Sequence, residues 1–157
     1  MSAPVRLWIA STHHRAFRNG GWAWVAKGAD GVTGYAGGER NTTAERSALA
    51  GLVAALKATA GPAVAQIDAA PVVQGFRNLE AWAAAGWRTA EGEPVGDADL
   101  WKIVAAAATA RSLTVSPLEP GPGKFAQAWA EFAADKAKAQ GAFTAAIPKP
   151  NLSKFPG

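Results

Sequence analysis

Few side chains capable of acid, base or metal chemistry stand close together in this sequence of 157 residues. The carboxylates of Glu45 and Asp68 are far apart along the chain, and the only two histidines, His13 and His14, are adjacent. Because the chain has no Cys, disulfides and thiolate metal sites are excluded. Any metal chemistry would therefore depend on carboxylates or His.

A positively charged loop is expected around the two histidines, which are followed by Arg15 and Arg18. The residues His13, His14, Arg15 and Arg18 are candidates for contact with phosphates or with a carboxylate-rich partner. Solvation is the ordinary state of adjacent exposed His side chains, and a metal or catalytic role is the alternative. The net charge of +4 is not by itself a nucleic-acid signature, because residues 61–110 carry three Lys or Arg against six acids.

The composition is typical of one packed domain. Hydrophobic residues make up 49% of the chain and seven residues are Trp, which is too apolar for a disordered protein. No apolar run approaches the roughly 20 residues that a membrane helix needs, and the N-terminus lacks the pattern of a signal peptide. We therefore expect a cytoplasmic protein that has no membrane segment.

The elements that must position these residues are predicted from the apolar pattern. Four apolar residues between positions 49 and 56 lie on one face of a helix introduced by Thr43, and a following strand at 64–67 ends at Asp68. The other expected strands are 5–9, 22–26, 32–36 and 113–115, and the other expected helices are 72–85, 98–110 and 126–140. This order, βββαβααβα, predicts an α/β domain with a five-stranded mixed sheet flanked by helices.

The domain is expected to cover residues 1–142. Residues 143–157 contain three Pro and are expected to form a Pro-rich C-terminal tail, with a short linear docking motif as the alternative. The segment 117–123 is rich in Pro and Gly, which favours a loop before the last helix.

A family resemblance rests on several motifs. The longest is Gly86-Trp87-Arg88-Thr89-Ala90, followed by Pro94-Val95 and Asp99-Leu100-Trp101. It is accompanied by Gly20-Gly21-Trp22, by Thr42-Thr43 with Arg46 and Leu49, and by Val72, Gln74 and Gly75. Together with the order of the expected elements, these motifs resemble bacterial ribonuclease HI, from Val5 to about Lys138, and imply the ribonuclease H-like fold.

Members of that family hydrolyse the RNA strand of RNA/DNA hybrids with two Mg²⁺ or Mn²⁺ ions held by four carboxylates. By motif, the four carboxylate positions correspond here to Ala10, Ala48, Asp68 and Ala130, with Trp129 as the alternative to Ala130. Alanine offers no ligand atom, so the resemblance implies a degenerate member in which only Asp68 is retained. We expect no cofactor, with Mg or Mn binding lost or weak.

Glu45 is the one acid expected to be able to replace the carboxylate missing at Ala48. It lies three residues earlier on the same helix, so the two Cβ atoms are about 5–6 Å apart. Two carboxylates would hold a single ion weakly where the family holds a pair. The alternative hypothesis is therefore residual metal-dependent cleavage of hybrids by Asp68, Glu45 and His14.

Nucleic-acid binding is expected to be weak. The Lys/Arg cluster that grips the hybrid in the family corresponds to residues 83–85, all Ala, and the segment after it carries acids at 91, 93 and 97. The loop that carries a His in the family corresponds to residues 118–123, which contain none. Thr43 either matches a phosphate-binding hydroxyl or caps the helix. Trp101 either matches an aromatic near the DNA-strand groove or packs in the core.

The leading hypothesis is a catalytically inactive, ribonuclease HI-like binding module. Its partner is expected to be a protein or, weakly, a nucleic acid. The Ala-rich segment 81–85, with Trp82 inside it and Trp87 beside it, is a candidate surface for a partner protein or for a homodimer.

Overall fold

A six-stranded mixed sheet forms the centre of the structure, a computed structural model in which residues 3–157 are described. The strands are β1 (Val5–His14), β2 (Asn19–Gly28), β3 (Gly31–Glu39), β4 (Ala63–Ile67), β5 (Leu113–Pro117) and β6 (Phe143–Ala146). Their order across the sheet is β5-β4-β1-β2-β3-β6. β1, β2, β3 and β6 are antiparallel neighbours, whereas β4 is parallel to both β1 and β5. Parallel pairing is expected where helices connect the strands.

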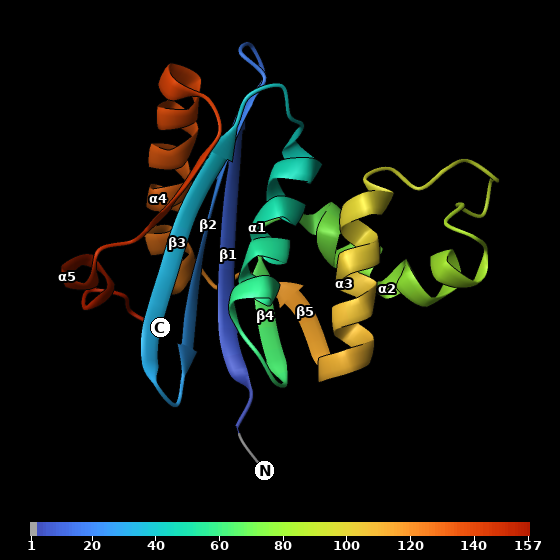
Figure 1. Ribbon diagram of the computed structural model, residues 1–157, viewed down its shortest axis with the longest axis horizontal. Coiled ribbons are helices and arrows are strands. Elements are labelled where there is room, and N and C mark those ends of the chain that lie inside the picture. Colours follow the sequence, from blue (N-terminus) through green and yellow to red (C-terminus); the bar gives the residue numbers. More distant parts are fainter. Residues whose placement is uncertain (1–2) are drawn as a thin grey trace.

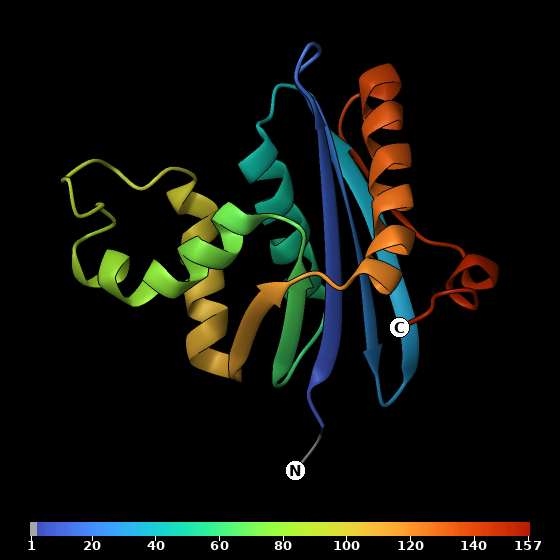
Figure 2. The same ribbon diagram turned by 180° about the vertical axis from the view of Figure 1, so that it is seen from behind.

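Helices cover both faces of this sheet (Figure 1, Figure 2). They are α1 (Ala44–Ala58), α2 (Ala70–Ala84), α3 (Ala98–Arg111), α4 (Pro120–Gln140) and the short α5 (Lys149–Leu152). Helices α1, α2 and α3 lie on one face, and α4 lies on the other face with the C-terminal segment. The predicted α/β class and the predicted order of the first nine elements are confirmed. No helix within residues 3–157 is both long and apolar enough to cross a membrane.

The sheet separates two apolar cores, and β1 contributes to both. Successive side chains of a strand point to opposite faces. Leu7 and Ile9 therefore pack under α1, whereas Trp8 and Ala10 pack under α4. All four side chains are at most 1% exposed, so the middle of β1 is buried on both faces of the sheet.

The prediction of five strands is wrong, because the segment expected to be a Pro-rich tail supplies a sixth. Residues 143–146 pair with β3 in antiparallel register. After them, Ile147, Leu152 and Phe155 are buried against the α4 face of the sheet. The prolines do not prevent this packing: Pro148 precedes the short α5 and Pro150 lies in its first turn, where a missing N–H costs nothing, and Pro156 follows the helix.

Helix α4 begins at Pro120 rather than at the expected residue 126, so the Pro- and Gly-rich segment is partly helical. The first N–H groups of a helix have no acceptor within the helix. Pro120 and Pro122 therefore cost no hydrogen bond in this first turn, and their fixed φ suits a helix start.

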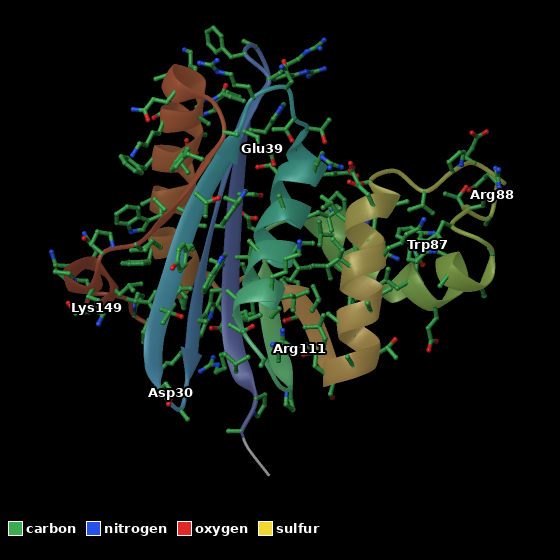
Figure 3. The ribbon with its side chains drawn as sticks, viewed as in Figure 1. Asp30, Glu39, Trp87, Arg88, Arg111 and Lys149 are labelled. Atoms are coloured by element: carbon green, nitrogen blue, oxygen red, sulfur yellow. The ribbon has the colours of Figure 1, made fainter. Side chains whose placement is uncertain are left out.

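Arg111, the last residue of α3, holds the end of α1 to the loop before β4 (Figure 3). Its guanidinium donates to the carbonyl oxygens of Leu56 at 2.7 Å, Thr59 at 3.0 Å and Gly61 at 2.7 Å. A cation at the C-terminus of a helix satisfies carbonyl groups that otherwise have no partner. These bonds hold the C-terminal end of α3 beside the C-terminal end of α1.

Candidate functional site

Asp68 lies directly after β4, beside the middle of β1, and its carboxylate is bound by Ser11. The Ser11 N–H donates to Asp68 Oδ2 at 3.0 Å, and the Ser11 hydroxyl donates to Oδ1 at 3.1 Å. Although part of the side chain is open to solvent, the surrounding protein raises the pKa of Asp68 by desolvation, and the two Ser11 bonds oppose that rise. Both carboxylate oxygens therefore have a protein donor.

The other three positions that match family carboxylates carry buried methyl groups. Ala10, Ala48 and Ala130 are each 0% exposed. Ala10 and Ala130 belong to the core under α4, and Ala48 belongs to the core under α1. Within residues 3–157, no group of three or more His, Asp or Glu side chains is placed so that it could hold a metal ion.

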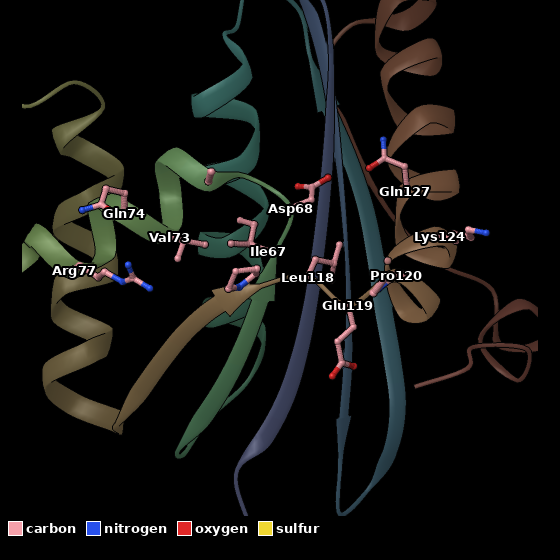
Figure 4. Close-up of a pocket in the computed structure, with 13 residues that line it drawn as sticks. Ile67, Asp68, Val73, Gln74, Arg77, Leu118, Glu119, Pro120, Lys124 and Gln127 are labelled. Atoms are coloured by element: carbon pink, nitrogen blue, oxygen red, sulfur yellow. The ribbon is translucent and has the colours of Figure 1, made fainter.

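A cleft of about 670 Å³ opens beside Asp68, between the start of α2 and the start of α4 (Figure 4). Its lining includes Asp68, Val73, Arg77, Leu118, Lys124 and Gln127. Lys124 and Gln127 are the α4 residues that bring polar side chains to this cleft, and Gln127 lies about one turn before Ala130. Ala130 faces the sheet, and Trp129 packs edge-to-face on Phe132 with ring centroids 5.6 Å apart.

Glu131 forms a polar cluster with the end of β1 that the sequence did not reveal. It accepts hydrogen bonds from Thr12 Oγ1 at 2.9 Å and from Gln127 Nε2 at 3.3 Å. His14 Nε2 lies 3.4 Å from Glu131 Oε2, and His14 Nδ1 lies 3.9 Å from Asp135. Desolvation raises the pKa of Glu131, but the bonds from Thr12, His14 and Gln127 outweigh it, so the pKa is lowered.

Replacement of Glu131 by Gln is expected to make folding less sensitive to acid. The folded-state pKa of Glu131 lies below its ordinary value of 4.5, so its ionised form contributes stability above that pH. That contribution is lost as the pH falls through the lower folded-state value. Urea unfolding at about pH 7 and about pH 3 should therefore show a larger loss for the natural protein than for Glu131→Gln.

The matched control for that measurement is Glu45→Gln, which removes an exposed carboxylate that accepts no hydrogen bond within residues 3–157. Glu131→Gln should lose less stability on acidification than this control does. A Glu131→Gln variant that loses as much stability on acidification would show that the cluster does not stabilise the ionised form.

The residues proposed to bind nucleic acid are only partly brought together. A pocket of about 470 Å³ at the N-terminus of α1 is lined by His13, Arg15, Arg18 and residues 41–44. We call these residues the basic pocket. His13 Nε2 contacts the Thr42 carbonyl at 2.8 Å, which joins the end of β1 to the start of α1. The exposed Arg15 and Arg18 lie on the β1–β2 turn.

Two of the proposed residues have structural contacts instead. Thr43 is the N-cap of α1, and its hydroxyl accepts the Arg46 N–H at 3.1 Å, although it also lines the basic pocket. Trp101 is 5% exposed and packs edge-to-face on Trp82 at 5.5 Å, so the core-packing alternative describes it. The His14 side chain contacts Glu131 of α4. Glu45 is exposed on the first turn of α1.

The acids at the start of α3, Asp97 and Asp99, are paired with an arginine, which the sequence did not indicate. Arg46 on α1 donates to Asp97 at 3.0 Å and to both carboxylate oxygens of Asp99 at 3.0 and 2.8 Å. The hydrogen bonds with Asp99 and Asp97 raise the pKa of Arg46, and the Arg46 bond lowers the pKa of Asp99. The contact joins two residues that belong to separate matched motifs, Arg46 on α1 and Asp99 on α3.

Comparison with known proteins gives sequence relatives named ribonuclease H or ribonuclease HI. Ribonuclease H of Cupriavidus pinatubonensis is 37% identical over 86 residues, which cover 53% of this chain and 59% of that protein. Ribonuclease HI of Caulobacter vibrioides is 35% identical over 91 residues, covering 56% and 61%. The chain thus matches less than two thirds of the length of these relatives. No protein-family model matches it.

Solved structures extend the similarity along the whole chain at the level of the fold. LC9-RNase H1, a type 1 RNase H with the type 2 active-site motif, has a TM-score of 0.74 at 19% identity and covers 98% of this chain and 81% of that one. LC11-RNase H1 in complex with an RNA/DNA hybrid has a TM-score of 0.65 at 13% identity, with 85% and 98% covered. The chain therefore has the ribonuclease H-like fold and is similar in sequence to bacterial ribonucleases H.

Proposed function

We propose that this protein is a catalytically inactive, ribonuclease H-like module that binds RNA/DNA hybrids through the basic pocket. The observation that carries the loss of catalysis is that positions 10, 48 and 130 hold buried methyl groups. Two divalent cations a few ångströms apart need several anionic oxygen ligands to balance their charge. Asp68 alone, with both oxygens already bound by Ser11, does not fit such a pair.

Support for binding comes from the charge and position of the basic pocket. Backbone N–H groups at a helix N-terminus favour anions, and His13, Arg15 and Arg18 surround this end of α1. Contacts between Arg and phosphate supply most of the affinity of proteins for nucleic acids. LC11-RNase H1 has been solved with a hybrid, which makes the hybrid the natural ligand class to test.

An intact hybrid is the expected product of an assay in which the protein is incubated with labelled RNA/DNA hybrid and Mg²⁺ or Mn²⁺. Neither the natural protein nor Asp68→Asn should cleave it, because the remaining carboxylate cannot hold a metal pair. Cleavage by the natural protein that disappears in Asp68→Asn would instead establish the alternative, a residual ribonuclease H activity.

In the same samples the natural protein should bind the RNA/DNA hybrid without cleaving it. Affinity should fall steeply between low and moderate salt, and Arg15→Gln or Arg18→Gln should each reduce the dependence of log affinity on log salt by about one. Lys57→Gln, at the opposite end of α1, is the control for the loss of one exposed positive charge. No binding even at low salt would defeat this function and leave a protein partner as the remaining hypothesis.

A further inference from the structure

The turn between β1 and β2 presents an exposed aromatic ring beside several cations. Phe17 is 60% exposed. The Lys138 amine, at the end of α4, lies 3.5 Å from the centre of the Phe17 ring. The β1–β2 turn, the loop before α1 and the C-terminal end of α4 lie at the same end of the molecule (Figure 1, Figure 2). We call Arg15, Phe17, Arg18 and Lys138 the hairpin end.

Arg40 holds this arrangement in place from the neighbouring loop. Its guanidinium donates to the carbonyl oxygens of Ala137 at 3.2 Å and Lys138 at 2.9 Å, which belong to the last turn of α4. The backbone at Lys138 is therefore fixed close to the β1–β2 turn. Because the amine lies over one face of Phe17 and more than half of the residue is exposed, the ring has a second face open to a ligand.

The charges at the hairpin end are available to an anion. Within residues 3–157, Arg15, Arg18 and Lys138 make no ion pair with an acidic side chain. Acids also lie near these cations: Glu39 at the end of β3 (Figure 3), Glu45 next to the pocket residue Ala44, and Asp135, which faces His14. Arg15 and Arg18 also line the basic pocket, so they connect the pocket with the turn that carries Phe17.

We propose that the hairpin end binds single-stranded nucleic acid, with an unpaired base stacked on the open face of Phe17. Backbone phosphates then contact Arg15, Arg18 and Lys138. Aromatic rings beside cations bind single strands of any sequence, because every base has a flat face to stack. The Lys138 amine, on the face of the Phe17 ring opposite the proposed base, makes an attractive cation–π contact with the ring. Bases in a duplex are already stacked on their neighbours and cannot use Phe17.

The ring distinguishes this ligand from an acidic protein, which the cations alone would attract equally. A carboxylate cannot stack on an exposed phenyl ring, whereas a planar base can. The inference rests on the proposed function to the extent that both use Arg15 and Arg18. It goes further because it names a single strand as the ligand and Phe17 as the residue that selects for it.

Fluorescence anisotropy with a labelled single-stranded oligonucleotide of about 12 nucleotides tests this inference. Phe17→Ala should weaken its binding roughly tenfold, because one stacked base is lost, whereas Phe17→Trp should retain it. The same Phe17→Ala variant should bind an RNA/DNA hybrid of equal length as the natural protein does. Arg15→Gln should weaken both ligands, and Lys57→Gln should weaken neither.

The outcomes separate the two proposals. Unchanged affinity of Phe17→Ala for the single strand, or an equal loss for single strand and hybrid, would overturn the stacking role while hybrid binding through the basic pocket stood. Hybrid binding that Arg15→Gln and Arg18→Gln leave unchanged would overturn the proposed function itself. Competition by polyglutamate as effective as competition by the unlabelled oligonucleotide would show a site for acidic proteins and overturn the inference.

Discussion

A chain that ends at residue 142 is expected to lose most of its stability. The missing segment buries Ile147, Leu152 and Phe155, which are 3%, 7% and 9% exposed. Phe155 packs edge-to-face on Trp8 at 4.9 Å and on Phe125 at 5.2 Å. Each buried side chain contributes about 1.5–3 kcal/mol, so the three together are worth roughly 4.5–9 kcal/mol. Whole domains of this size are stable by only about 5–15 kcal/mol.

Urea unfolding measures this loss of stability. Trp fluorescence is a suitable signal, because Trp8 packs against Phe155 and is affected by its removal. Phe155→Ala in the full chain should reproduce about 3 kcal/mol of it. Phe132→Ala is the control, since Phe132 is 51% exposed and its removal opens no cavity. A truncated chain with the same unfolding midpoint as the full chain would mean that residues 143–157 are a separable tail after all.

Gly21→Ala is expected to be the most destabilising of the single methyl additions considered. A Cβ at this position would overlap backbone atoms of Ala130 and Ala134 on α4. Backbone cannot rotate out of the way as a side chain can, so α4 must move off β2. Overpacking of this kind costs about 3 kcal/mol or more. The shift would also strain the bond from Asn19 Nδ2 to the Ala134 carbonyl, now 2.7 Å long.

Gly121→Ala is the matched control, because a Cβ there meets no atom within 4 Å. It lies in the first turn of α4, where Ala is favoured over Gly, so its thermal midpoint should stay equal or rise slightly. Thermal unfolding of the two variants side by side checks the prediction. A Gly21→Ala midpoint within a degree or two of the natural protein would show that α4 is less closely packed on β2 than described.

The fold could be predicted from the sequence wherever the evidence is local and periodic. The apolar face of α1 and the turn signals of the β1–β2–β3 meander depend on residues close in the chain, and these elements are confirmed. The sixth strand could not be found this way. Ile147, Leu152 and Phe155 are spaced irregularly among prolines, and they are recognisable as core residues only when the sheet and α4 are present.

The candidate site was less predictable, because its contacts join distant residues. Asp68 and Ser11 are separated by 57 positions, and Thr12 and Glu131 by 119, so no local pattern indicates either pair. The motif match places Ala130 at a former carboxylate position, and that assignment stays a prediction; in the structure Ala130 faces the sheet, whereas Lys124 and Gln127 line the cleft. The spacing of buried alanines along α4 was the available signal for that face.

Arginines fasten α1 and α3 to each other at both ends. Arg46 joins the first turn of α1 to the start of α3, and Arg111 joins the last turn of α3 to the end of α1. Two helices linked at both ends open as one cooperative unit, so fraying of either should expose amides of both to hydrogen exchange together. Residues 85–96, which connect α2 to α3, lie outside these arginine contacts, so we expect them to exchange independently of the α1–α3 pair.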